Sequence, residues 1–106
     1  MPDFNDLISQ AKKMQEKMKE TQEMIKNLEI TGNAGGNLVK ITLNGDSEIK
    51  KIDIDKSIFN EKKEMLEDLI IAAHADAKQK LKIKTDEEIS KVTGGVNLPE
   101  GFKFPV

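Results

Sequence analysis

Residues 39–54 read VKITLNGDSEIKKIDI, and this stretch decides the fold. Apolar and polar residues alternate from residue 39 to residue 43, which predicts a strand with one buried face. Asn44-Gly45 comes next and is a strong signal for a hairpin turn. A second apolar strand, residues 49–54, follows the turn. The stretch therefore predicts two antiparallel strands joined by a short connection.

The second of these strands shifts phase in its middle. Ile49 and Ile52 are separated by Lys50-Lys51, where strict alternation allows one intervening residue. A β-bulge or a late strand start accounts for this shift. Upstream, residues 29–31 (EIT) read as a short strand and residues 32–37 (GNAGGN) as a turn, because glycine and asparagine tolerate positive φ. The centre of the chain is therefore expected to form a three-stranded antiparallel sheet with one apolar face.

A long helix is predicted before the sheet. Its apolar positions are alternately three and four residues apart, a pattern that only Thr21 breaks. The stripe consists of Phe4, Leu7, Ala11, Met14, Met18, Thr21, Ile25 and Leu28. At about 1.5 Å per residue the helix is nearly 40 Å long, more than a small core covers. One interpretation is an amphipathic helix on its own sheet. We favour the other, in which part of the stripe meets a partner helix, with a dimer seam at Leu7, Ala11, Met14, Met18 and Ile25.

A second long helix is expected after the sheet. Asn60 is a plausible N-cap, and Gly94-Gly95 marks the end of the helix. Residues 85–88 (TDEE) read as a capping box that would start a new helix near Lys84. Because Leu81, Thr85, Glu88 and Val92 lie on one continuing face, we favour one unbroken helix to about Val92. The tail, residues 96–106, is irregular and apolar, and we expect it to dock or bind a partner, with simple disorder as the alternative.

The composition bounds the domain and its location. The chain has 106 residues, enough for one domain with a modest core, so association is an expected source of stability. Cysteine is absent, which excludes a disulfide framework and thiolate chemistry. No apolar run approaches the roughly 20 residues that span a bilayer, and residues 1–4 (MPDF) do not resemble a signal peptide. We therefore expect a single cytoplasmic domain with no membrane partner.

The charged residues limit the kind of nucleic-acid contact. All 17 basic residues are lysine, and 19 acidic residues give a net charge of −2. Arginine, the usual reader of guanine edges, is absent, as are the tyrosine and tryptophan that stack on single-stranded bases. Sequence-specific readout and base stacking are thus poorly supported. Phosphate contact by lysine remains open.

Residues typical of catalytic or metal sites do not form a site in the sequence. His74 and Asp76 are two positions apart on a helix and point to different sides. No second histidine and no cysteine can join them around a metal ion. The glycine-rich residues 32–37 lack the P-loop lysine pattern and join two strands. We predict a binding protein without enzymatic activity, metal, cofactor or small-molecule substrate.

A set of motifs in order resembles a known family. The set is residues 35–40 (GGNLVK), Asn44-Gly45, residues 52–55 (IDID), residues 63–69 (KEMLEDL) and residues 94–102 (GGVNLPEGF). It resembles the YbaB/EbfC family of bacterial nucleoid-associated proteins over nearly the whole chain, taken as one domain, residues 1–106. Two departures are Asn37, where many members carry glycine, and residues 74–77 (HADA), where Phe-Asn-Asp-Ala is common.

The resemblance implies an α+β fold in the order α-β-β-β-α and a tweezer-like homodimer whose helices project from a joined sheet. It also implies binding to double-stranded DNA with little sequence specificity, a place in the nucleoid, and an influence on nucleoid organisation and gene expression. The alternative is a protein-interaction adaptor that uses exposed helices or the apolar tail beside replication or repair factors.

The DNA contacts are predicted from charge alone, because the resemblance does not identify them. Acids are sparse near two groups of lysines, although a charge run is often only a solvated face. Local basic zones on an acidic chain can still form a positive surface once the chain is folded and doubled. The predicted DNA-contacting residues are Lys12, Lys13, Lys78, Lys80, Lys82 and Lys84.

Overall fold

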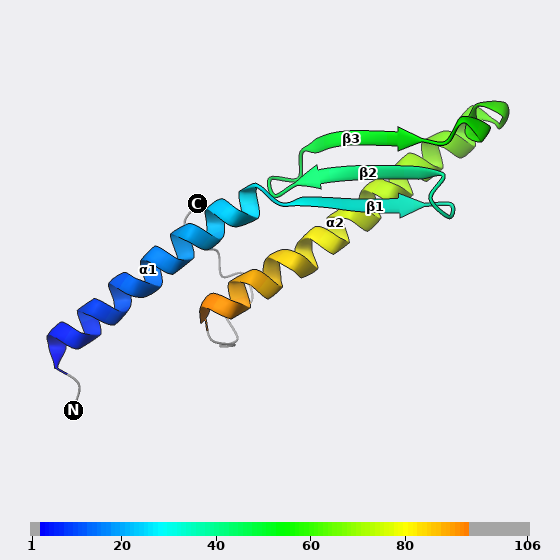
Figure 1. Ribbon diagram of the computed structural model, residues 1–106. Helices are drawn as coiled ribbons and strands as arrows, with labels where there is room; N and C mark the ends of the chain where they lie inside the picture. Colours follow the sequence, from blue (N-terminus) through cyan, green and yellow to red (C-terminus); the bar gives the residue numbers. More distant parts are fainter. Residues whose placement is uncertain (1–2, 94–106) are drawn as a thin grey trace.

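The computed structural model describes residues 3–93. The elements follow in the order α1 (Phe4–Lys26), β1 (Glu29–Ala34), β2 (Val39–Asn44), β3 (Ile49–Ile54), η1 (Lys56–Asn60) and α2 (Lys63–Thr93) (Figure 1). The predicted α+β order, a long helix, three strands and a second long helix, is confirmed. The tail lies outside the described residues, so its predicted docking is not tested by the fold.

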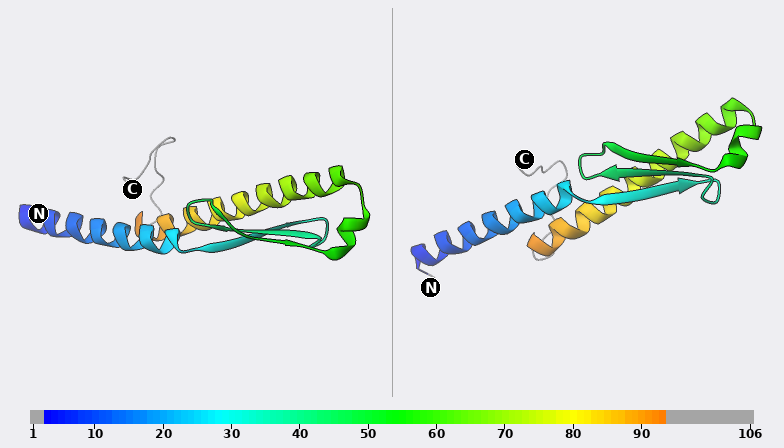
Figure 2. Two further views of the ribbon diagram at one scale, coloured as in Figure 1. Left: turned by 90° about the horizontal axis from the view of Figure 1, so that it is seen from above. Right: turned by 45° about the horizontal axis from the view of Figure 1, so that its top comes forward.

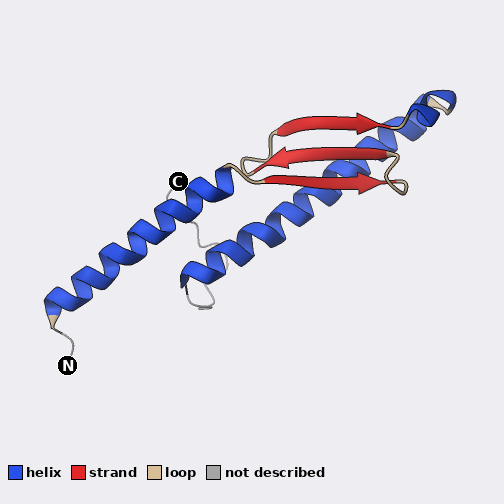
Figure 3. Cartoon of the chain, in the orientation of Figure 1, coloured by secondary structure: helices blue, strands red, loops and turns tan. Residues whose placement is uncertain are grey.

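The three strands form one antiparallel sheet in the order β1-β2-β3 (Figure 3). Val39, Ile41 and Leu43 are fully buried, and the residues between them point to the other, more polar face. Thr42 pairs with Lys51 while Leu43 pairs with Ile49, which leaves Lys50 as the extra residue. Of the two explanations for the shift of phase, a bulge or a late strand start, the bulge is therefore the one present.

Helix α2 crosses the side of the sheet that carries these buried residues, over β1 and β2 (Figure 2). Its contact residues Ala73 and Ala77 are small and fully buried. On β1 the helix meets Gly32, where an added Cβ would collide with the backbone of both alanines. Small residues on both sides thus bring the helix backbone close to the strand and position everything else on α2.

The start of α2 differs from the prediction. Asn60 does not cap it: residues 56–60 form the 3-10 helix η1, and α2 begins at Lys63. Asp55 caps η1, and its carboxylate accepts hydrogen bonds from the Ser57 amide at 2.9 Å and the Ser57 hydroxyl at 2.7 Å. These bonds lower the pKa of Asp55. The helix then runs unbroken to Thr93, so the continuous helix is confirmed and a break near Lys84 is excluded.

The β2–β3 connection confirms the hairpin that Asn44-Gly45 predicts. The Asn44 side-chain oxygen accepts from the amides of Asp46 and Glu48, and Ser47, with φ of 64°, occupies the left-handed region. Gly45 is needed for space, because a side chain there would collide with the backbone of Ile25 at the end of α1. Its amide also donates to the Lys26 carbonyl at 3.4 Å. The turn therefore anchors the base of α1.

Helix α1 projects from the rest of the molecule (Figures 1 and 2). None of its residues is buried, and only its C-terminal half, from Met18 onward, has half-buried side chains. This half runs beside the C-terminal part of α2. The expectation that the core is too small to cover the whole apolar stripe is confirmed.

Candidate nucleic-acid interface

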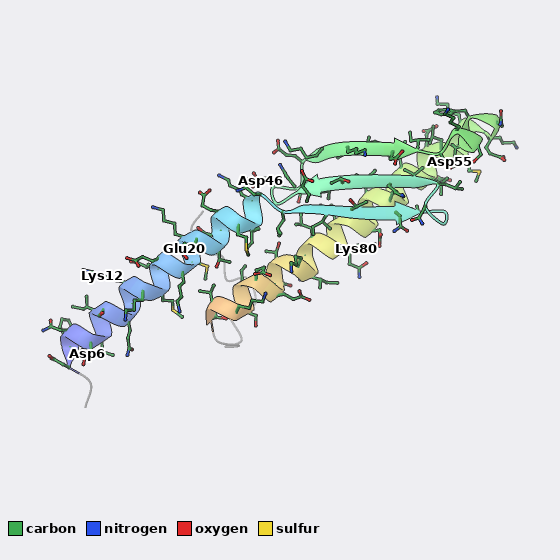
Figure 4. The ribbon with its side chains drawn as sticks, in the orientation of Figure 1. Asp6, Lys12, Glu20, Asp46, Asp55 and Lys80 are labelled. Atoms are coloured by element: carbon green, nitrogen blue, oxygen red, sulfur yellow. The ribbon has the colours of Figure 1, made fainter. Side chains whose placement is uncertain are left out.

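The predicted lysines lie on two separate elements. Figure 4 shows Lys12 on the projecting helix α1 and Lys80 on α2, which packs on the sheet. The structure therefore does not gather all six into one site within a single chain. Two short rows of lysines result, one on each long helix.

Three of the four predicted DNA-contacting lysines on α2 form ion pairs with acids one helical turn away. Lys80 bonds to Asp76 at 2.8 Å and Lys82 to Asp86 at 3.0 Å. Lys84 contacts Glu88 at 3.2 Å. Sequence reasoning missed these acids because it looked for them between the lysines. On a helix the relevant neighbours lie three or four residues away, and that spacing could have revealed the pairs.

Glu88 forms ion pairs with two lysines of α2. Its carboxylate is shared by Lys91, at 3.0 Å, and Lys84. Glu88 is the one charged residue among the described ones that is buried. Hydrogen bonds from Lys91 and Lys84 lower its pKa. Lys84 is therefore poorly placed to neutralise a phosphate, because it already forms an ion pair with the buried carboxylate of Glu88.

The remaining predicted lysines are free of such pairs. Within the described residues, Lys12, Lys13 and Lys78 are exposed and form no ion pair. Lys78 borders a groove of about 480 Å³ between α2 and the β2–β3 turn, which Gly45 and Ser47 also line. Lysine ammonium groups in such positions can approach a phosphate without displacing an acid. Of the six predicted lysines, Lys12, Lys13 and Lys78 are thus the ones with no acid bound to their ammonium groups within the described residues.

The predicted dimer seam is only partly uncovered. Leu7, Ala11 and Met14 are exposed, whereas Met18 and Ile25 are half-buried on the part of α1 that runs beside α2. The outer half of the seam therefore has no cover among the described residues, and its inner half is used within the chain. The dimer seam stays a prediction.

A second uncovered apolar surface, the β3 flank, consists of Ile49 and Ile52. Their cross-strand partners, Leu43 and Ile41, are fully buried, and directly opposite residues share one face of a sheet. Yet Ile49 and Ile52 are 48% and 46% exposed, because α2 covers β1 and β2 and leaves this side of β3 open. The apolar pattern shows that these residues face the core side. Where a helix crosses the sheet cannot be read from that pattern.

Asp76 has a structural role in place of a metal-binding one. Its carboxylate accepts from the Asn33 amide at 2.9 Å and pairs with Lys80, which joins α2 to the edge of β1. The hydrogen bond from Lys80, followed by that from Asn33, lowers its pKa. His74 is half-buried, and no cluster of potential metal ligands occurs in residues 3–93.

None of the helices described is both long and apolar enough to span a bilayer.

The chain is similar in sequence and in fold to known proteins. The model of the YbaB/EbfC DNA-binding family matches residues 1–96. A nucleoid-associated protein of Rickettsia canadensis (strain McKiel) is 50% identical over 106 residues, covering 99% of each chain. The crystal structure of an uncharacterized protein from Helicobacter pylori has a TM-score of 0.70 at 22% identity, covering 89% of this chain and 100% of that one. This last likeness supports the fold alone.

Proposed function

The chain belongs to the YbaB/EbfC DNA-binding family, and from this premise we propose that it is a nucleoid-associated protein that binds double-stranded DNA as a homodimer. The name of the relative from Rickettsia canadensis, which is half identical along the whole chain, supports the nucleoid as its place and hence the cytoplasm. The observation that carries the mechanism is that three of the six predicted lysines, Lys12, Lys13 and Lys78, are exposed and form no ion pair within the described residues.

DNA binding in this proposal rests on phosphate contact. Lysine is a compact charge that neutralises phosphate without reading base edges. The chain has no arginine, tyrosine or tryptophan to supply direct readout or stacking. Affinity should therefore be modest, strongly dependent on salt and nearly independent of sequence. In this proposal the protein organises DNA by binding along the duplex and catalyses no reaction.

In a homodimer each chain supplies its own copies of these lysines, so the number available to one duplex is doubled.

Two apolar surfaces of the chain are uncovered, the β3 flank and the outer half of α1. We assign the contact with the second copy to the β3 flank. Ile49 and Ile52 are continuous with the buried core through their strand partners, so covering them extends an existing core. The sequence-predicted seam on α1 is the competing location for this contact.

Three matched variants test the dimer surface by sedimentation equilibrium. Ile52→Lys places a charge in the flank and should yield a monomer, because an unpaired lysine is costly to desolvate. Met14→Lys does the same in the seam, and Ile83→Lys, at a comparably exposed site on α2, is the control. We expect the wild type and both of the latter variants to be dimers. A monomeric Met14→Lys with a dimeric Ile52→Lys would assign the interface to the seam, and a monomeric wild type would refute the dimer.

Fluorescence anisotropy with labelled duplexes tests the DNA-binding function. Several unrelated sequences should bind with similar affinity at low salt, and all should dissociate as salt rises. The uncovered apolar surfaces favour a second candidate, a protein-interaction adaptor. Absence of binding to every duplex at low salt would refute DNA binding and support the adaptor.

A further inference from the structure

The outer half of α1 carries an apolar ridge, defined here as Phe4, Leu7, Ala11 and Met14. Phe4, Leu7 and Met14 are 72%, 51% and 49% exposed, so nothing among residues 3–93 covers the ridge. The residues are spaced three or four apart and therefore share one side of the helix. A continuous ridge of this length on a projecting helix is costly to leave in water.

The two long helices are arranged so that the C-terminal end of α2 is directed toward the half of α1 that carries this ridge (Figures 1 and 2). α1 and α2 run side by side in opposite directions, and α2 points at its C-terminal end toward the outer half of α1 (Figures 1 and 2). The described chain ends at Thr93, and 13 residues follow it in the sequence. Gly94-Gly95 comes first and permits a change of direction.

The sequence of the tail has a pattern suited to an extended segment with one apolar side. Residues 96–106 read VNLPEGFKFPV. Alternate residues of an extended chain point to the same side. Five of the six even positions are apolar, and they are Val96, Leu98, Phe102, Phe104 and Val106. The odd positions include Pro99 and Pro105, which lack an amide donor and favour an extended conformation without strand pairing.

We propose that residues 96–106 dock on the apolar ridge of α1 in the same chain. The 13 residues after Thr93 span at most roughly 43 Å when extended at about 3.3 Å each. The ridge, from Phe4 to Met14, is about 15 Å long at 1.5 Å per residue. The extended segment is thus nearly three times as long as the ridge, which leaves residues to connect the end of α2 to it.

The same chain is the favoured source of the tail because of the tether. A short linker holds its ends at an effective concentration in the millimolar range, above the concentration of a second copy in solution. Docking on the ridge also leaves the positive charge available. Lys12 and Lys13 follow Ala11 and lie farther round the helix, away from the ridge.

A double-mutant cycle in the full-length chain tests the contact. Leu7→Ser and Phe104→Ser should each lower the thermal midpoint, and the double variant should lower it no further than the larger single effect. Lys103→Ser, at an odd position of the tail, is the matched control and should combine additively with Leu7→Ser. Full additivity of Leu7→Ser and Phe104→Ser would overturn the proposal.

Paramagnetic broadening locates the tail directly and identifies its source. The chain has no cysteine, so Lys103→Cys carries a single spin label. In isotope-labelled protein, the amide signals of residues 4–14 should lose intensity, and the loss should persist when the sample is diluted with a large excess of unlabelled, spin-free protein. A loss that disappears on dilution would show docking on a second copy. A loss confined to Ile49 and Ile52, or no loss in the described residues, would likewise overturn the proposal.

Discussion

Replacing Gly32 with alanine tests whether the close approach of α2 to β1 holds the fold together. In a strand, alanine ordinarily stabilises relative to glycine by about 0.5 to 1 kcal/mol, because glycine loses more backbone entropy on folding. At Gly32 we expect the opposite sign. The added Cβ would lie 2.5 Å from the Ala73 carbonyl oxygen and 2.6 Å from the Ala77 Cα, short of the 3.4 Å at which ordinary contact begins.

The size of the effect follows from what must move. The obstructing atoms belong to the backbone, so no side-chain rotation relieves the overlap, and α2 must shift away from Val39, Ile41 and Leu43. Overpacking of a well-packed core costs about 1 to 3 kcal/mol, and a backbone collision belongs at the upper end. We expect a loss of about 3 kcal/mol, a large part of the total stability of a small domain.

Urea denaturation followed by circular dichroism, at one fixed protein concentration, measures this loss. With a slope of about 2 kcal/mol per molar urea, the midpoint should fall by about 1.5 M. Gly36→Ala is the control: Gly36 has φ of 64° but no atom near the new Cβ, so only the left-handed backbone cost of about 1 kcal/mol is expected. A Gly32→Ala protein as stable as the wild type would show that α2 does not pack as described.

Three further substitutions probe other parts of the account. Ile41→Ala removes a fully buried side chain and should lower the free energy of unfolding by about 2 to 5 kcal/mol in the same urea assay. The pKa of Asp76 is lowered in the folded state, so the ionised carboxylate stabilises the fold above pH 3.8, the ordinary pKa of aspartate. This stabilisation is lost as pH falls through the lowered pKa. Asp76→Asn should therefore flatten the decline of the thermal midpoint on the acid side. Gly45→Ala should loosen the base of α1 and speed hydrogen exchange in its last turn, because the new side chain meets the backbone of Ile25.

The strands illustrate what the sequence could predict and where it stopped. Alternation from Val39 to Leu43 identified the buried strand, and the spacing of Ile49 and Ile52 located the bulge, because both depend on local periodicity. Exposure of the β3 flank depends instead on where α2 crosses the sheet. That crossing is fixed by the contact of Gly32 with Ala73 and Ala77, residues far apart in the sequence.

The conformation of the β2–β3 turn, the capping residue and the ion pairs of the α2 lysines could not be predicted, for related reasons. Asn44-Gly45 predicted the hairpin, but Ser47 takes the left-handed conformation and Gly45 is required by a helix that ends elsewhere in the sequence. Asn60 has the side chain of an N-cap residue, yet it is the last residue of η1, and the capping residue of that helix is Asp55. The α2 lysines looked unopposed in sequence, whereas helical spacing pairs Lys82 with Asp86. Each miss involves a contact between positions that are not adjacent along the chain.

The salt dependence of DNA affinity tests the central claim most directly. A dimer that uses Lys12, Lys13 and Lys78 from each chain neutralises six phosphates, so log K against log salt should have a slope of about −5 at roughly −0.9 per contact. Lys12→Gln with Lys13→Gln should reduce the slope to about −2 on every duplex, and Lys80→Gln with Lys82→Gln should change it less, because these lysines are paired with acids. An unchanged slope for the Lys12 and Lys13 variant, or a loss of affinity confined to one sequence, would contradict the account.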